Sequence, residues 1–165
     1  MCSKLLQMEV IINNRRVKYE DGEIYTYFKW GGTSKIYKWY LLKGAIHKET
    51  GYRIVKINYK NYQYHRVIYK LYNPDWNIND NSKKNLIDHI DRNRLNNNIE
   101  NLRVVTQQQN QFNTNCKGYC WDKGRNKWRV EITVNRKKEY VGYFINEEDA
   151  KNKYLELKKI YHVIN

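Results

Sequence analysis

The chain has 165 residues, of which 41% are hydrophobic; this suits one medium or two small domains, and no apolar run is long enough for a membrane helix. Its 31 Lys and Arg outnumber 17 Asp and Glu, which gives a net charge of +14. The excess is spread along the chain, with +9 in residues 1–115 and +5 in residues 116–165. This distribution favours a polyanionic partner over a merely soluble basic protein.

Residues 1–62 are predicted to form strands and turns. The pair Asp21-Gly22 marks a turn, and residues 52–57 alternate apolar and polar side chains as a strand does. A helix is expected to follow from Tyr64 and to end at Pro74, because proline cannot continue a helix.

Residues 63–115 contain the polar side chains that predict chemistry. A short strand ends in Asp88-His89, a loop rich in Asn and Arg follows, and residues 102–105 form a second strand. Thr106 then caps a helix, and Gln109 three residues later completes a capping box. This order places Asn110 one turn into the helix, where it can face back to the first strand.

Hydrolysis of a phosphodiester needs a base, a cation and fixed geometry. Adjacent strand residues point to opposite sides, so Asp88 can bind a metal ion while His89 addresses water. Asn110 adds a neutral oxygen ligand. One carboxylate and one amide oxygen suit Mg²⁺ or Mn²⁺ and do not suit zinc. Asn101 is expected to hydrogen-bond the backbone across the loop and so to hold His89 in place.

Over residues 51–115 the chain resembles the HNH, or ββα-metal, nucleases of the phage homing type. The matching motifs are Gly51-Tyr52, His65-Arg66, Asp88-His89-Ile90-Asp91, Asn101-Leu102-Arg103 and residues 106–110. The resemblance implies that His89 is the general base, that Asp88 and Asn110 bind the metal, and that Asn101 is structural. Members of this family often nick one strand of DNA, an outcome that a single metal site per chain fits, but the sequence does not give the number of strands cut. The usual glycine after the Asp-His-x-Asp core is Arg92 here.

Three arginines, Arg92, Arg94 and Arg103, lie close to this core in sequence. Each is either a clamp for phosphate or the transition state, or a salt-bridged surface residue. His65 either lies near the site or the DNA, or packs in the interior. The remaining histidines, His47 and His162, are expected on the surface.

Residues 116–165 are predicted to form three short strands and a helix. Residues 128–134 alternate, with Trp128, Val130 and Ile132 facing inward. Asn146 is the expected N-cap of the helix, whose buried stripe is expected to be Ala150, Tyr154, Leu157 and Tyr161.

Residues 118–162 resemble an AP2/ERF domain, a three-stranded sheet packed on one helix. The matching residues are Gly118-Tyr119, Trp121, Lys127-Trp128-Arg129, Glu131-Ile132, residues 140–144 and Glu148-Asp149-Ala150. The resemblance implies that the outward face of the sheet lies in the major groove of DNA. On that face we expect Trp121, Lys123, Arg125, Lys127, Arg129, Lys138 and Tyr140.

The three cysteines, Cys2, Cys116 and Cys120, form neither a disulfide framework nor a zinc site with two pairs of ligands. The N-terminus lacks the apolar core of a signal peptide. We therefore expect free thiols and a cytoplasmic location, within the host cell if the source is a virus.

The expected fold class is α+β. A ββα-metal nuclease unit with N-terminal strands (residues 1–115) is followed by a three-stranded antiparallel sheet packed on one helix (residues 116–165). The expected function is a site-specific, homing-type HNH endonuclease that uses one divalent ion. Its partner is double-stranded DNA, with no membrane and no obligate protein partner, and the chain is expected to be a monomer. The alternatives are a DNA-binding regulatory protein with an inactive nuclease unit, and an RNA-binding or structural protein that relies on charge alone.

Overall fold

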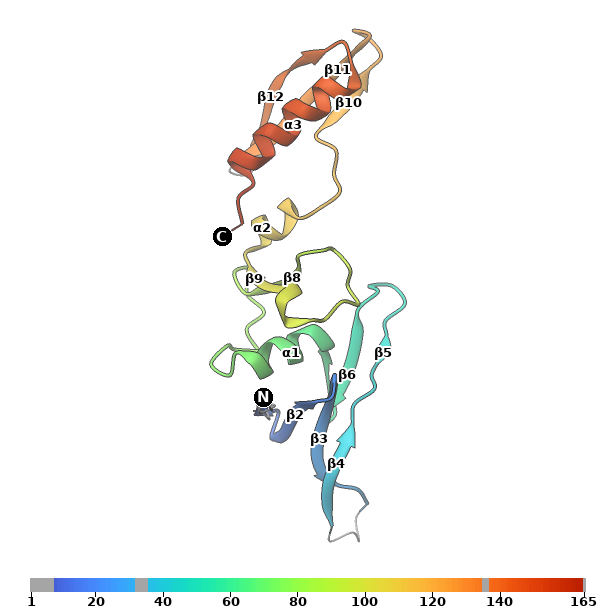
Figure 1. Ribbon diagram of the computed structural model, residues 1–165, viewed down its shortest axis with the longest axis vertical. Helices are drawn as coiled ribbons and strands as arrows, with labels where there is room; N and C mark the ends of the chain where they lie inside the picture. Colours follow the sequence, from blue (N-terminus) through green and yellow to red (C-terminus); the bar gives the residue numbers. More distant parts are fainter. Residues whose placement is uncertain (1–7, 32–35, 135–136, 165) are drawn as a thin grey trace, which may run out of the picture. The chain divides into compact units, whose positions relative to one another are not determined.

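The computed structural model describes residues 8–31, 36–134 and 137–164, and it divides between Val104 and Val105 into two units (Figure 1). The division precedes the expected boundary after residue 115. Helix α2 (Gln107–Phe112) belongs to the second unit, where the ring of Phe112 stacks on that of His162 at 4.1 Å. Cys2 lies outside the described residues, and the assignment of separate roles to the two expected domains stays a prediction.

An antiparallel sheet with the strand order β1-β2-β3-β4 opens the first unit. Its strands are β1 (Met8–Ile12), β2 (Arg15–Glu20), β3 (Glu23–Lys29) and β4 (Tyr37–Leu41). Two-residue turns join the first three strands, and all four turn residues have positive φ: Asn13, Asn14, Asp21 and Gly22. Asn, Asp and Gly tolerate this left-handed backbone best, so the prediction of a turn at Asp21-Gly22 is confirmed.

A second small sheet and a helix complete this part of the chain. The elements are β5 (Ala45–Ile46), β6 (Arg53–Ile57), β7 (Lys60–Gln63) and α1 (Tyr64–Tyr72). The turn before β7 is tied to the first sheet, because Asn13 Nδ2 donates to the carbonyls of Ile57 and Asn58, and Asn58 Nδ2 donates to that of Asn13. Two hairpin turns distant in sequence therefore hold each other.

The core of the first unit lies between α1 and these sheets. The helix contributes Val67, Ile68 and Leu71, each at most 2% exposed, against Val17 and Ile24 of the first sheet. The helix ends where Pro74 predicts, with Asn73 as its C-cap. The predicted start of the helix at Tyr64 is likewise confirmed.

The central segment has the predicted order of strand, loop, strand and helix. The two strands β8 (Leu86–His89) and β9 (Leu102–Val105) pair, and η1 (Ile99–Asn101), a single 3₁₀ turn, precedes β9. The predicted capping box at the start of α2 is present: Thr106 Oγ1 accepts from the Gln109 N–H, and Gln109 Oε1 accepts from the Thr106 N–H. The fold is mixed α and β, with several antiparallel sheets and few helices.

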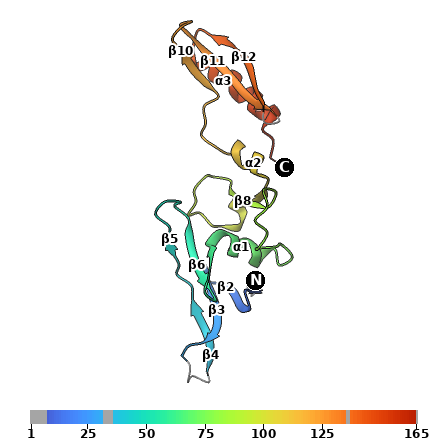
Figure 2. The same ribbon diagram turned by 180° about the vertical axis from the view of Figure 1, so that it is seen from behind.

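Three strands and one helix form the end of the second unit, as predicted. They are β10 (Tyr119–Asp122), β11 (Lys127–Val134), β12 (Lys137–Phe144) and α3 (Glu147–Tyr161). Helix α3 lies across one face of the sheet, in front of it in Figure 1 and behind it in Figure 2. Among the described residues, no helix has the length and apolar character needed to cross a membrane.

Most of the residues that were expected to face inward lie in the core of this unit. Val130, Ile132, Ala150 and Tyr154 are buried, and Trp128 and Leu157 pack against them. Tyr161 does not belong to this stripe: it is 48% exposed at the last turn of α3, where the helix has passed the end of the buried cluster.

Candidate functional site

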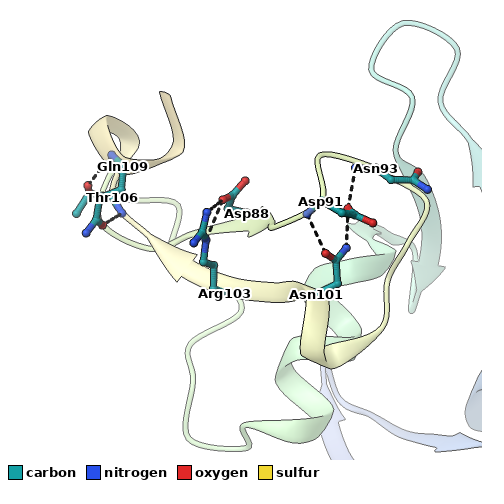
Figure 3. Close-up of polar contacts among 7 residues, drawn as sticks. All are labelled: Asp88, Asp91, Asn93, Asn101, Arg103, Thr106 and Gln109. Carbon is teal, nitrogen blue, oxygen red and sulfur yellow. Dashed lines mark hydrogen bonds and ion pairs between the residues drawn. The ribbon is translucent and has the colours of Figure 1, made fainter. Parts of the chain in front are cut away.

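Asp88, on β8, is 7% exposed and pairs with Arg103 on the neighbouring strand (Figure 3). Both Nε and Nη2 of Arg103 donate to the same carboxylate oxygen, Oδ2 of Asp88, at 3.0 and 2.9 Å. A buried carboxylate needs such a charged partner, since desolvation alone would disfavour its ionised form. Arg103 was expected either to clamp phosphate or to form a salt bridge. The structure shows the salt bridge, and the partner of Arg103 in it is Asp88, the candidate metal ligand.

His89 follows on the opposite side of the strand and is 3% exposed. Its Nε2 lies 3.2 Å from Oδ1 of Asn97, and its ring centroid lies 4.8 Å from that of His65 and 5.9 Å from that of Tyr52. Asp88 and His89 thus have different neighbours, as strand alternation predicts.

Of the two readings of His65, the structure shows the packed one, beside the candidate base His89. It is 3% exposed within α1, and its ring touches that of His89. Burial, with smaller contributions from His89 and Arg66, lowers the pKa of His65 to about 3. A neutral imidazole therefore packs behind His89 at neutral pH.

Asn101 bridges the loop that follows His89 (Figure 3). Its Oδ1 accepts from the Asp91 N–H at 3.0 Å, and its Nδ2 donates to Oδ1 of Asp91 and to the carbonyl of Asn96. The predicted bond to the backbone across the loop is present. The Asn96 side chain, the Asn93 N–H and then Asn101 hold the pKa of Asp91 below its usual value.

Arg92 stands where the resemblance leads us to expect glycine, and its backbone keeps a glycine-type conformation. Its φ is 65°, in the left-handed region, and its N–H donates to the carbonyl of His89 at 2.9 Å. Arg92 and Arg94 are both exposed residues of this loop. Arg94 donates to the carbonyl of Thr50 at 2.7 Å and stacks over the ring of Tyr52.

Two residues beside His89 were assigned no role from the sequence, namely Tyr52 and Asn97. Tyr52 had a signal, since it belongs to the Gly51-Tyr52 motif of the family resemblance. Asn97 had none, because it is one of three consecutive asparagines with the same chemistry. Only the path of the loop distinguishes it from its neighbours.

Asn110 lies on α2, in the second unit, and is exposed; its N–H donates to the carbonyl of Thr106. Its convergence with Asp88 stays a prediction. Within the part of the chain that the structure describes, no three His, Cys, Asp or Glu side chains are grouped to hold a metal. The predicted pair needs no such group, since a carboxylate and an amide are hard oxygen donors of the kind Mg²⁺ and Mn²⁺ accept.

The C-terminal sheet has an outward face that carries part of the predicted basic set. Trp128, Val130 and Ile132 face α3, so Lys127, Arg129 and the residues paired with them face outward. Lys138 pairs with Thr133 and Tyr140 with Glu131, which places both on this face. Arg129 forms an ion pair with Glu131 at 3.3 Å. Lys123 and Arg125 lie in the turn before β11.

Trp121 is not on that face, and its predicted placement is wrong. It pairs directly with Trp128, and directly opposed residues of an antiparallel pair point to the same side. The centroids of the two rings lie 5.5 Å apart, and Trp121 is 44% exposed.

The two outlying histidines differ from each other. His47 is exposed, as predicted. His162 is half-buried rather than on the open surface, because its ring stacks on Phe112 and its Nε2 lies 2.8 Å from the carbonyl of Thr133.

Comparisons with known proteins concern the same central segment. Residues 62–112 match the HNH endonuclease family. The chain is 42% identical over 86 residues to an uncharacterized HNH endonuclease of Acanthamoeba polyphaga mimivirus. The aligned region covers 52% of this chain and 39% of the viral protein. The chain is also 37% identical over 59 residues to Protein 3.8 of Escherichia phage T7. That aligned region covers 31% of this chain and 49% of the phage protein.

The chain thus spans less than half the length of either curated relative. No solved structure matches it. The segment from residue 62 to residue 112, which contains Asp88, His89, Asn101 and Asn110, is similar to HNH endonucleases.

Proposed function

We propose that this protein is a site-specific DNA endonuclease of the HNH homing type, which hydrolyses a phosphodiester with one divalent ion. The observation that carries the proposal is the pair Asp88 and His89, both buried, with separate partners on the two sides of β8. This pair lies within the segment that matches the HNH endonuclease family.

The contact between Asn97 and His89 supports one assignment of the base nitrogen. Asn97 Nδ2 donates to the carbonyl of Leu95, which turns its Oδ1 toward His89 Nε2. An amide oxygen only accepts, so a His89 ring that donates from Nε2 would complement it. In this proposal Nδ1 of His89 takes the proton from the attacking water.

Asp88 and Asn110 would hold the metal ion, Mg²⁺ or Mn²⁺. When bound, such an ion polarises the phosphate and stabilises the leaving oxygen. Arg103 orients the Asp88 carboxylate, and Asn101 fixes the loop that begins after His89.

The charge of the chain supports duplex DNA as the substrate. The net charge is +14, and Lys127, Arg129 and Lys138 share the outward face of the C-terminal sheet. Arg92 and Arg94 offer further positive charge on the loop beside His89. In this proposal the sheet positions the duplex, and the central segment cleaves it.

A second candidate is a DNA-binding regulator whose nuclease unit is inactive. The observation that favours it is the Arg103 ion pair, because a guanidinium on the Asp88 carboxylate competes with a metal ion for the same charge. It predicts duplex binding without any metal-dependent product.

Nicking of supercoiled plasmid with Mg²⁺ tests the proposal on the full chain. We expect Asp88→Ala and His89→Ala to abolish nicking, with a loss of about 10²-fold or more for the base. His47→Ala is the matched control, since this histidine is exposed, and it should cut as the wild type does. Equal rates for wild type and His89→Ala would refute the role of His89.

Circular dichroism of each variant shows that the loss is not unfolding. Wild-type protein that binds duplex DNA yet gives no product with Mg²⁺ or Mn²⁺ would favour the regulator. Binding that shows no preference for duplex DNA over RNA in a salt titration would favour the charge-only alternative.

A further inference from the structure

A cavity of about 780 Å³ opens in the first unit where the β1–β4 sheet extends beyond the core. Along one face of β3 the side chains change from Ile24, fully buried in the core, to Thr26 and then to Phe28. Tyr40 pairs with Thr26 and lies on the same face. The sheet thus continues past its aliphatic core as an aromatic surface. The volume falls within the range of ordinary ligand sites.

Three aromatic rings form one wall of this cavity. The centroid of Phe28 lies 4.5 Å from that of Tyr40 and 5.8 Å from that of Trp30. Trp30 is 70% exposed, and its contacts with Phe28 and Tyr40 make it part of one contiguous aromatic patch. Exposed aromatic planes of this kind are the surfaces on which unpaired bases stack.

The charged side chains around the rings are all cations. Arg15, Lys29 and Lys56 line the cavity, and no described residue that lines it is acidic. The Arg15 guanidinium lies 5.1 Å from the Phe28 centroid. This arrangement favours a ligand that combines a flat ring with negative charge.

Thr26 supplies an unused polar group. It is 4% exposed, it lines the cavity, and its Oγ1 has no hydrogen-bond partner among the described residues. A buried hydroxyl without a partner is costly, and most such groups are satisfied in folded proteins. Neighbouring atoms cover this oxygen in the free protein, so the polar edge of a ligand in the cavity would satisfy it once the covering side chains shift.

We propose that this aromatic pocket, formed by Thr26, Phe28, Trp30 and Tyr40 with Arg15 and Lys56 beside it, binds an unpaired nucleotide of DNA. The base stacks on the rings, its polar edge bonds Thr26 Oγ1, and the flanking phosphates meet the cations. Bases within a duplex cannot offer their faces in this way, so the target has to present a base outside the helix. The choice of DNA rests on the proposed function, whereas the binding itself needs no hydrolysis.

Binding in EDTA, where no strand is cut, tests the pocket on the full chain. The ligand is a labelled single-stranded DNA oligonucleotide with one 2-aminopurine, read by anisotropy and by 2-aminopurine emission. Trp30→Ala should weaken binding about tenfold and restore the emission that stacking quenches. Trp30→Phe should retain most of both signals. Tyr161→Ala, which removes an aromatic ring that is 48% exposed on α3, should bind as the wild type does.

A second variant separates recognition from folding. Thr26→Val keeps the shape of the side chain and breaks no hydrogen bond of the free protein. We expect unfolding midpoints equal to or above the wild type and binding weakened by about three- to tenfold.

Equal affinity of wild type and Trp30→Ala for the single strand would overturn the proposal, as would an equal loss for a fully paired duplex. Tighter binding of an RNA oligonucleotide of the same sequence would overturn the assignment to DNA. Absence of plasmid nicking would refute the nuclease while leaving this binding result intact, so the two failures are distinguishable.

Discussion

Arg103 on β9 donates two hydrogen bonds to a single carboxylate oxygen of Asp88 on β8, so a candidate metal ligand is already oriented by the strand beside it. The side chain of Asp88 is 8% exposed and that of Arg103 is 28% exposed. The pair therefore lies largely outside solvent, where charges interact more strongly than at the surface.

The first prediction concerns the coupling of this pair. Arg103→Met should destabilise the protein by about 1–3 kcal/mol, because it leaves a buried carboxylate without its cation. In a double-mutant cycle with Asp88→Asn, measured by urea unfolding, the double variant should lose less than the sum of the single variants.

The ion pair between Glu9 and Arg16 is the matched control for this cycle. Its side chains are 35% and 52% exposed, so solvent screens the pair and its coupling should be smaller than that of Asp88 and Arg103. A coupling for Asp88 and Arg103 no larger than that of the control would contradict the prediction.

The second prediction concerns the backbone of Arg92, whose φ is 65°. Arg92→Gly and Arg92→Ala both remove the side chain, but only glycine removes the Cβ that disfavours this conformation. The glycine variant should therefore be more stable than the alanine variant by about 1 kcal/mol in thermal or urea unfolding. Equal stability of the two would show that the left-handed backbone carries no strain.

The third prediction is a pH dependence due to His65. Its pKa is about 3 in the folded protein and has the ordinary value of 6.5 when unfolded. Below pH 6.5 the unfolded chain binds a proton that the folded protein does not, so stability falls as the pH drops toward 3. Between pH 6 and 5 this contribution should lower the stability by about 1.2 kcal/mol, and it should fade within about one pH unit above 6.5.

Urea unfolding of His65→Phe at several pH values checks this result. The variant keeps a buried ring but cannot titrate, so its stability should fall less than that of the wild type on acidification. His47→Ala, at an exposed histidine, should keep the wild-type slope. Parallel curves for wild type and His65→Phe would argue against a buried neutral imidazole.

The fourth prediction concerns the cap of α2, the helix that carries Asn110. Thr106→Ala removes the acceptor for the Gln109 N–H and should cost about 1 kcal/mol of helix stability. Amide exchange of the Gln109 N–H should become faster in this variant. Gln107→Ala, at an exposed position in the same turn, should change exchange little, and equal protection in both variants would refute the cap.

Local patterns predicted the elements well because their causes are local. Alternation along residues 128–134, the proline after α1 and the Thr106 to Gln109 spacing each describe interactions within a few residues. Charge and the Asp88-His89 pair likewise indicated the region that proved similar to HNH endonucleases.

The predictions were wrong where the position of a side chain depends on a residue distant in the sequence. The face of Trp121 follows from its register with Trp128, and the position of His162 follows from its stacking on Phe112. Tyr161 continues the helical period of α3, yet the core ends before it.

The sequence by itself determined the order of strands and helices, the basic charge and the candidate pair Asp88 and His89, because these follow from residue type and short spacing. Only the tertiary structure decided that Asp88 pairs with Arg103, that Asn97 rather than its neighbours meets His89, and that aromatic rings gather over Thr26. These contacts join side chains from separate strands and loops, and strand register and loop path select among residues that are chemically equivalent along the chain.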